Sequence, residues 1–502
     1  MPRAQSIGAR AVGRVITVTS ETKAGRLSMY IGGEWIDSAS GETFDRISPV
    51  TGEVLASLPR ANREDAQAAI DAANRARSHM ASLPVFERAA LCHAIADVLE
   101  SKRKSMGEEL SLEQGKPYRE ACDEILFAAE LYRDAAENIK RLETSIVPSV
   151  DPNKRILTIR QPHGVVAIIT PWNFPVGIPS EYLSAALAAG NTMVWKPAPT
   201  SSIIAIRLVE CFLEAGVPEG SVNLLFGDAE VGDEMVGNPG THAVGLTGSS
   251  AVGNAVAQRA GAKPLLLELG GNGPTIILDD ADLERAIEGT AFGCYHNAGQ
   301  ICQSSERILT HNKIHDAVLE GLVQKTRSIR LGHPLDETTT MGPLNNEGVA
   351  KKMDEHLADA VQKGATVVTG GRRAEGFPTA LYYEPTVVDG VPPESLFNHE
   401  ETFGPVAPVI STEDLDEAIA VANSCGLGLC CSVYTSNVSK AFYCAEQLEC
   451  GVVNVNESAA YWDGRIPFGG YSGKGSGVGR LGGKETILSM TQLKSMVMDV
   501  RM

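Results

Sequence analysis

The strongest constraint on the fold of this chain is a regular alternation of apolar runs and helical segments in its first half. Short apolar runs at 165–169, 192–195 and 222–225 are separated by two segments, 180–189 and 201–215, whose apolar residues have helical spacing. Strands that alternate with helices pair in parallel, so this order predicts an α/β fold with a doubly wound parallel sheet. Ligands bind such sheets at the carboxyl ends of the strands.

The flanking segments follow other patterns. Residues 63–141 have mainly helical spacing, and a second α/β stretch runs from 272 to 471. Two segments, 154–162 and 489–500, alternate as exposed strands do, which predicts a homodimer or homotetramer that shares sheet edges. Because 502 residues exceed what one ordinary core holds, we expect two or three domains.

Composition limits the partners and the compartment. Lys and Arg number 44 against 62 Asp and Glu, and the net charge of −18 is unfavourable for binding nucleic acid. We find no run of roughly 18 apolar residues and therefore expect no membrane span. The ten cysteines are scattered without a C-x-x-C pair, which indicates a cytoplasmic enzyme with reduced thiols and no metal site.

The first 28 residues differ from the rest, with five basic residues and a single acid. We expect an N-terminal tail there. The alternative is an organelle transit segment, which is also rich in Arg and Ser and poor in acids.

Cys302 is the leading candidate for chemistry. It lies in the loop sequence Asn-Ala-Gly-Gln-Ile-Cys-Gln-Ser at 297–304. A thiol is mostly protonated at neutral pH, so it needs a base, a dipole or a positive neighbour before it can attack a carbon atom. Glu268, 34 residues upstream in Leu-Glu-Leu-Gly-Gly-Asn, is a candidate base, and the pair predicts covalent catalysis.

Three segments after predicted strands carry polar groups suited to a ligand. Asn173 follows the 165–169 strand in a turn stiffened by two prolines, where its amide can stabilise an oxyanion. Lys196 ends the next strand and can reach a ribose or a phosphate, while Gly248 and Ser249 open a helix whose N–H groups suit a pyrophosphate. The structural alternatives are a turn satisfied by its own Asn, a solvated lysine, and a tight turn before a helix.

The C-terminal part contains a literal G-x-G-x-x-G at 477–482. We reject it as a dinucleotide-binding fingerprint, because no strand leads into it and only 20 residues follow. We expect an irregular loop near the mouth of the site instead. Glu401 is one of two adjacent acids that can bind a ribose, and Phe468 can form a pocket wall.

In this order, these segments resemble the NAD(P)-dependent aldehyde dehydrogenase superfamily over about residues 28 to 500. One such segment occurs by chance, but seven in order over most of a chain do not. They are Pro-Trp-Asn-Phe-Pro at 171–175, Lys196, Thr-Gly-Ser at 247–249, Glu-Leu-Gly-Gly at 268–271, Gly-Gln-Ile-Cys at 299–302, Glu-x-Phe-Gly-Pro at 401–405 and Pro-Phe-Gly-Gly at 467–470.

The resemblance implies roles for individual residues. Cys302 is then the nucleophile, Glu268 the general base, and Asn173 forms the oxyanion hole with the backbone N–H of Cys302. The residues implied to lie near the substrate are Phe174, Ile301, Gln303 and Phe468. Those implied to bind the cofactor are Ile169, Thr170, Trp172, Asn173, Lys196, Pro199, Gly227, Gly248, Ser249, Leu269, Glu401 and Phe403.

The resemblance also implies a division of the chain after the tail at 1–28. The expected parts are a cofactor-binding domain at 29–145 and 165–271, a catalytic domain at 272–475, and a small β oligomerisation element at 146–164 and 485–502.

The implied reaction is the oxidation of an aldehyde to its carboxylic acid. Thiolate attack gives a thiohemiacetal, hydride leaves to NAD or NADP, and water activated by Glu268 hydrolyses the resulting thioester. The presence of Glu268 favours hydrolysis over transfer to coenzyme A. Pro199 stands where NAD-preferring members often have a glutamate that binds both ribose hydroxyls, so the choice between NAD and NADP stays open.

Two positions indicate the substrate class. Similar enzymes that oxidise succinate semialdehyde carry two arginines for the far carboxylate, and the aligned positions here hold Glu181 and His296. An acid cannot hold a carboxylate, and histidine does so only when protonated. We therefore expect an uncharged or aromatic aldehyde ahead of succinate semialdehyde, with candidate aromatic walls at Tyr461, Trp462 and Phe468.

Two other classes of protein stay open. A Cys–His hydrolase with His296 or His163 as base would explain Cys302 but not the segments around Lys196 and Gly248. A binding or structural role of the fold alone would leave Cys302, Glu268 and Asn173 together unexplained.

Overall fold

The structure, a computed structural model, describes residues 25–501. The tail or transit segment predicted at 1–28 therefore lies mostly outside the described residues. Residues 25–28 correct its expected boundary, because Gly25–Arg26 form strand β1 and Leu27 is buried. Strand β1 pairs in parallel with β5 (Val54–Pro59), and β4 (Thr43–Ile47) completes this small sheet.

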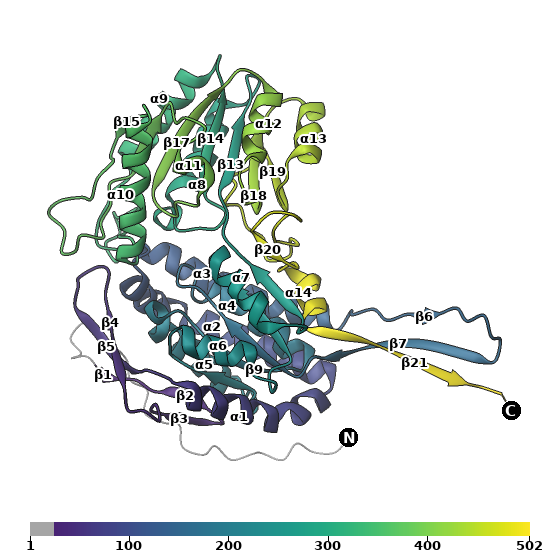
Figure 1. Ribbon diagram of the computed structural model, residues 1–502. Helices are drawn as coiled ribbons and strands as arrows, with labels where there is room; N and C mark the ends of the chain where they lie inside the picture. The colour runs from purple at the N-terminus through teal and green to yellow at the C-terminus, as the bar shows by residue number, and fades with distance from the viewer. Residues whose placement is uncertain (1–24, 502) are drawn as a thin grey trace.

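The doubly wound parallel sheet that the sequence predicts is confirmed in the lower half of the molecule (Figure 1). Its strand order is β20-β12-β11-β8-β9-β10-β2-β3, and the five strands from β12 to β10 are parallel. The bounds are β2 Met29–Ile31, β3 Glu34–Ile36, β8 Val165–Ile169, β9 Thr192–Lys196, β10 Val222–Leu224, β11 Ala243–Thr247, β12 Leu265–Glu268 and β20 Gly477–Val478.

Helices bury the central strands of this sheet. Helices α1, α4, α5, α6 and α7 pack on its strands, and the long helices α2 and α3 pack on α4 and α5. All five residues of β9 are buried, as expected for a parallel strand covered on both faces. The bounds are α1 Arg63–Ser82, α2 Val85–Gln114, α3 Tyr118–Ile139, α4 Gly177–Ala189, the short 3₁₀ helix η1 Pro199–Ser201, α5 Ser202–Glu214, α6 Ala229–Gly237 and α7 Ser250–Ala260.

A second, seven-stranded sheet forms the upper half, with the order β15-β16-β17-β14-β13-β18-β19 (Figure 1). Its strands are parallel except for the edge strand β15. The strands are β13 Gly273–Ile277, β14 Ser305–His311, β15 Thr366–Thr369, β16 Thr386–Asp389, β17 Val406–Thr412, β18 Cys430–Tyr434 and β19 Val452–Val455. The helices are α8 Leu283–Tyr295, η2 His296–Gly299, α9 His315–Ser328, α10 Glu347–Gln362, α11 Leu396–His399, α12 Leu415–Asn423 and α13 Val438–Gln447.

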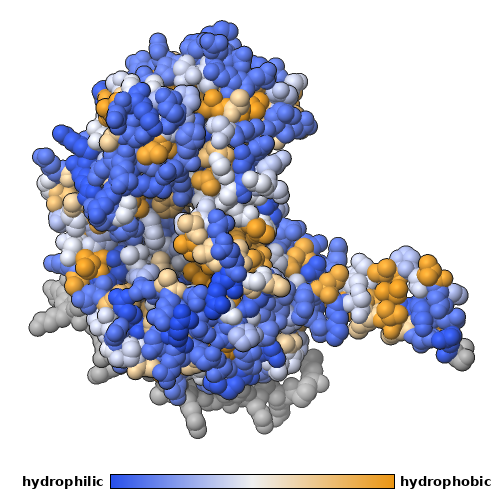
Figure 2. All heavy atoms as spheres, viewed as in Figure 1, coloured by the Kyte–Doolittle hydropathy of each residue, from blue (hydrophilic) through white to orange (hydrophobic). Residues whose placement is uncertain are grey.

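A three-stranded arm projects from the side of the lower half, beside α14 (Figure 1). Strand β21 (Thr491–Asp499) follows helix α14 (Gly483–Ser489) and pairs antiparallel with β7 (Lys154–Pro162), which confirms both predicted strands. The short strand β6 (Ile146–Val147) pairs with the other edge of β7. Apolar side chains are exposed along this arm and appear as orange patches in Figure 2.

The segment at 477–482 corrects one expectation. We expected an irregular loop, but Gly477–Val478 form β20, which pairs antiparallel with β12. Glu268 lies opposite Gly477 in this pairing, so the segment supports the strand that carries the candidate base. None of the helices among residues 25–501 is long and apolar enough to cross a membrane.

Candidate active site

The loop that carries Cys302 is a tight connection between α8 and β14. Asn297 (φ 49°) and Ala298 (φ 55°) have left-handed backbone conformations, which side chains other than glycine rarely adopt. Gly299 follows with φ 72°, and a Cβ atom there would lie 2.1 Å from the carbonyl oxygen of Gly404. The loop is therefore held closely against the 400–404 segment, and Cys302 is only 8% exposed.

Glu268 ends strand β12 and is 2% exposed. Burial raises the pKa of its carboxyl group to about 8, although hydrogen bonds to Cys302 and Thr247 oppose the shift. Burial, followed by the neighbouring Glu268, raises the pKa of the Cys302 thiol well above its usual range. The two groups thus share a dry site in which a proton can pass from the thiol to the carboxylate.

Asn173 lies in the turn between β8 and α4 and is 2% exposed. Its Nδ2 atom donates one hydrogen bond, of 3.0 Å, to the carbonyl oxygen of Gln300, two residues before Cys302. An amide nitrogen carries two hydrogens, so the second N–H remains for an oxyanion.

Cys302, Glu268 and Asn173 line one cavity of about 190 Å³ between the two halves. It brings together predicted residues from five separate segments of the chain. Its other lining residues are Pro171, Trp172, Thr247, Gly248, Ser249, Leu269, Gly270, Glu401 and Phe403. Pro171, Thr247 and Gly270 were not assigned a role from the sequence, although each adjoins a quoted motif.

The start of helix α7 forms one wall of this cavity. Ser249 is the N-cap, and its side chain accepts a 3.4 Å hydrogen bond from the backbone N–H of Val252. A Cβ atom at Gly248 would meet only Leu246 within 4 Å, so space remains over the helix start. Free N–H groups at a helix start with open space beside them suit a phosphate group.

The opposite wall contains Glu401 and Phe403. Both carboxylate oxygens of Glu306 accept hydrogen bonds, of 2.6 and 2.7 Å, from the backbone N–H groups of Thr402 and Phe403. Phe403 is thereby held at φ 63°, with its ring edge-on to Trp172 at 5.5 Å. Glu401 accepts a 2.8 Å hydrogen bond from the N–H of Gly271, and burial raises its pKa to about 7.

Five predicted cofactor residues do not line this cavity. Lys196 is buried and donates a 2.9 Å hydrogen bond to the carbonyl oxygen of Gly227, and burial lowers its pKa to about 8. Thr170 accepts a 2.9 Å hydrogen bond from the indole of Trp195. Pro199 begins η1. Ile169 adjoins Lys196, since a Cβ atom on Gly232 would lie 3.6 Å from both side chains.

A second cavity, of about 350 Å³, lies on the other side of the Cys302 loop. The predicted substrate residues Phe174, Ile301 and Gln303 line it. So do Glu120, Asp123, Glu124, Phe127, Gly177, Ile178, Phe292, His296, Ala460, Tyr461 and Trp462. The α3 residues and Phe292 were missed from the sequence, because helical spacing does not show which helix face meets a cavity.

Two expected pocket residues lie elsewhere. Phe468 does not line the second cavity but packs behind Trp462, with ring centroids 4.8 Å apart, and contacts the same apolar cluster as Cys302. Glu181 is 3% exposed and borders a separate small cavity between α3, α4 and α14. Neither carboxylate oxygen of Glu181 has a hydrogen-bond partner among the described residues, and burial raises its pKa well above the usual range.

The two histidines considered as bases are placed for other contacts. His296 stacks on Phe292 at 4.7 Å and lies 3.4 Å from a carboxylate oxygen of Glu120. His163 lies near the arm, 3.1 Å from the carbonyl oxygen of Ser489. Glu268 lines the same cavity as Cys302 and neither histidine does, which disfavours the Cys–His hydrolase.

Comparisons with known proteins agree with this geometry. The model of the aldehyde dehydrogenase family matches residues 35–496. A glutarate-semialdehyde dehydrogenase of Pseudomonas putida is 38% identical over 478 residues, which cover 95% of this chain and 98% of that protein. The NADP-dependent succinate-semialdehyde dehydrogenase of Escherichia coli is 38% identical over 474 residues, covering 94% and 97%. The crystal structure of a succinate-semialdehyde dehydrogenase from Burkholderia pseudomallei superimposes with a TM-score of 0.92 at 37% identity, covering 95% and 98%.

Proposed function

The chain belongs to the aldehyde dehydrogenase family and oxidises an aldehyde to the carboxylic acid with NAD or NADP, and we propose that it does so through a thioester on Cys302. The observation that supports this route is the common cavity of Cys302, Glu268 and Asn173. The open space at Gly248, the start of α7 and the carboxylate of Glu401 suit the phosphates and a ribose of the dinucleotide.

In the first half of the proposed reaction, the Cys302 thiol passes its proton to Glu268 and the sulfur bonds to the aldehyde carbon. The carbonyl oxygen becomes an oxyanion that accepts hydrogen bonds from Nδ2 of Asn173 and the backbone N–H of Cys302. NAD(P), when bound, accepts the hydride from that carbon. The C–O double bond re-forms and leaves a thioester on Cys302.

In the second half, Glu268 first releases the thiol proton to solvent and then takes a proton from water as the water oxygen attacks the thioester carbon. The same two donors stabilise the second oxyanion, and collapse expels the Cys302 sulfur, which regains a proton. The products are the carboxylic acid and the free thiol. Burial suits Glu268 to this task, because a base whose pKa is near 8 accepts a proton more readily than an ordinary carboxylate.

We propose an uncharged or aromatic aldehyde as substrate. The cavity beside Cys302 is lined by the rings of Phe127, Phe174, Phe292 and Trp462, and no Lys or Arg is among its described lining residues. Three carboxylates, Glu120, Asp123 and Glu124, belong to the same lining. Asp123 pairs with Arg103 and Glu124 with Lys116, so neither pair offers a free cation to a substrate. A second carboxylate on the substrate would be desolvated there without a cationic partner, which is unfavourable. The names of the relatives make the succinate and glutarate semialdehydes the competing candidates.

A substrate panel tests this assignment. Initial rates are measured with benzaldehyde, hexanal, succinate semialdehyde and glutarate semialdehyde, each with NAD and with NADP. We expect kcat/KM to be at least about tenfold higher for benzaldehyde and hexanal than for the two semialdehydes. A tenfold difference corresponds to a cost of ~1.4 kcal/mol for burying the unpaired carboxylate of a semialdehyde. Turnover with both cofactors is expected, since Pro199 provides no acid to repel a 2′-phosphate. A preference for either semialdehyde would contradict the substrate proposal.

A matched variant tests the reason for that preference. The double change His296→Arg with Glu120→Gln places a cation in the second cavity and removes the carboxylate 3.4 Å from it. We expect its kcat/KM for succinate semialdehyde to rise about tenfold, as one hydrogen bond to a charged group provides. The single change Glu120→Gln is the control and should give a smaller rise.

We also propose that the protein forms a homodimer or homotetramer through its arm and resides in the cytoplasm. The exposed apolar residues of β21 support an interface. The ten cysteines, all free in the structure, support a reducing compartment.

A further inference from the structure

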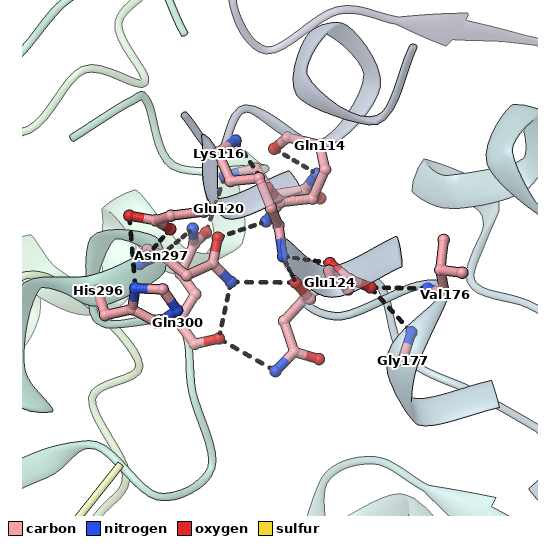
Figure 3. Close-up of polar contacts among 11 residues, drawn as sticks. Gln114, Lys116, Glu120, Glu124, Val176, Gly177, His296, Asn297 and Gln300 are labelled. Carbon is pink, nitrogen blue, oxygen red and sulfur yellow. Dashed lines mark hydrogen bonds and ion pairs between the residues drawn. The ribbon is translucent and has the colours of Figure 1, made fainter. Parts of the chain in front are cut away.

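Lys116 is a buried cation for which the proposed reaction has no use. It lies between α2 and α3, and its side chain is fully enclosed. Its ammonium group contacts a carboxylate oxygen of Glu124 at 2.6 Å (Figure 3). It also contacts the carbonyl oxygen of Asn173 at 2.8 Å and the ring of Phe174 at 3.9 Å. Burying a charge is costly, so it is expected where the contacts compensate for lost water.

Lys116 binds the start of the turn at residues 173–177, and Glu124 binds its end. The second carboxylate oxygen of Glu124 accepts hydrogen bonds from the backbone N–H groups of Val176, at 2.8 Å, and Gly177, at 3.0 Å (Figure 3). These N–H groups lie at the start of helix α4, so the negative carboxylate also interacts favourably with the positive end of the helix dipole. Lys116 and Glu124 therefore bind both ends of residues 173–177, the turn that carries Asn173.

The turn is joined to the nucleophile loop through the same atoms. The carbonyl oxygen of Asn173 accepts a second hydrogen bond, of 3.0 Å, from Nδ2 of Asn297. Nδ2 of Asn297 and Nδ2 of Asn173 both lie within hydrogen-bond distance of the carbonyl oxygen of Gln300, at 3.3 and 3.0 Å. Nε2 of Gln114 in turn donates a 3.1 Å hydrogen bond to Oδ1 of Asn297. Lys116 is thus the positively charged member of the network that connects the oxyanion donor to the Cys302 loop (Figure 3).

We propose that Lys116 and Glu124 are positioning residues for the oxyanion hole: they fix the backbone of the 173–177 turn so that the free N–H of Asn173 faces the reacting oxygen. The inference rests on the proposed role of Asn173. The physical reason is that a donor stabilises an oxyanion only within a narrow range of distance and angle, and a displacement of about 1 Å removes much of the effect. An Asn side chain alone cannot hold that position, because its direction follows from its backbone.

A double-mutant cycle between Lys116→Met and Asn173→Ala tests the proposal. The readout is the pre-steady-state burst of reduced cofactor at saturating aldehyde and cofactor, which reports formation and oxidation of the thiohemiacetal. We expect Asn173→Ala to slow the burst by about 10²–10³-fold, as loss of one oxyanion donor does. Lys116→Met should slow it by about tenfold or more in the native background, and by less than about twofold in the Asn173→Ala background.

Two further measurements separate positioning from general damage. The rate of Cys302 alkylation by iodoacetamide should stay within about twofold of the native value in Lys116→Met, because the thiol itself needs no oxyanion donor. Arg207→Met is the matched control. Arg207 pairs at 2.7 Å with Glu109 between α5 and α2, with both side chains at most 15% exposed. Its loss should lower the thermal midpoint and leave the burst rate intact.

The outcomes distinguish the two levels of inference. If Asn173→Ala leaves the burst rate unchanged, the oxyanion assignment itself is wrong. If Asn173→Ala slows the burst but Lys116→Met does not, or if their effects multiply, the positioning role is wrong. Should Lys116→Met fail to fold, Lys116→Met with Glu124→Gln removes both buried charges while keeping an acceptor for Val176 and Gly177, and the same cycle is run with that pair.

Discussion

Glu268 is the buried side chain on which both halves of the proposed reaction depend. It lies 2% exposed at the end of a parallel strand and lines the same cavity as Cys302 and Thr247. Burial raises the pKa of each member of the Cys302–Glu268 pair, so the resting pair keeps its protons at neutral pH. The chemistry therefore starts from the fraction of molecules in which Glu268 is ionised and can accept the proton of the Cys302 thiol.

A pH profile tests this role. A carboxyl group with a pKa raised to about 8 is mostly protonated below pH 8, and only its ionised form can take a proton from water. We expect the single-turnover rate of thioester hydrolysis to rise about tenfold per pH unit up to pH ~8 and then level off. Glu268→Gln should abolish this rise and let an acyl adduct on Cys302 accumulate, visible by intact mass spectrometry. Normal turnover without an adduct would exclude Glu268 as the base.

At the scale of secondary structure, strand β12, which carries the proposed base Glu268, pairs along one edge with the short strand β20. Gly477 lies opposite Glu268 at φ 119°, and a Cβ atom there would lie 2.0 Å from the carbonyl oxygen of Leu267. Only glycine allows this approach, because any side chain would enter the backbone of β12. The glycine-rich segment, rejected as a dinucleotide fingerprint, therefore supports the catalytic strand.

Gly477→Ala is expected to lower both stability and activity. The clash with Leu267 should cost about 3 kcal/mol and displace Glu268, lowering kcat as well as the midpoint of urea unfolding. Gly473→Ala is a matched control, since Gly473 has φ 88° but no atom within 4 Å of its Cβ position. The control should cost only about 1 kcal/mol, with normal kcat. Equal losses in the two variants would show that backbone strain alone explains the effect.

At the scale of the whole molecule, the arm exposes apolar side chains that no other part of the described chain covers. Leu493 and Val497 are 58% and 63% exposed on the same face of β21. Such side chains on a projecting pair of strands favour a partner subunit, because exposed apolar patches of this kind are uncommon on monomers. The arm also leaves two strand edges with unpaired backbone groups.

Two charges on this face should change the oligomeric state. We expect Leu493→Lys with Val497→Lys to convert the proposed dimer or tetramer into a smaller species, measured by light scattering after size exclusion, because the new cations would be desolvated in the interface. Gln492→Lys lies on the opposite face of the same strand and should leave the mass unchanged. A native protein that is already monomeric would refute the proposed assembly.

The sequence by itself determined the parallel sheet and the order of the motifs, because both depend on local patterns. Strand 165–169 was predicted with the bounds that β8 has, and Ser249 lies at the helix start where the spacing placed it. Only the tertiary structure decided the convergence of side chains from distant segments. Lys116 meets Asn173 across 57 residues, and α3 lines the substrate cavity with a face that helical spacing does not single out. The reason is physical: periodicity reports which residues are buried, while the partner that compensates each buried charge depends on how the elements pack.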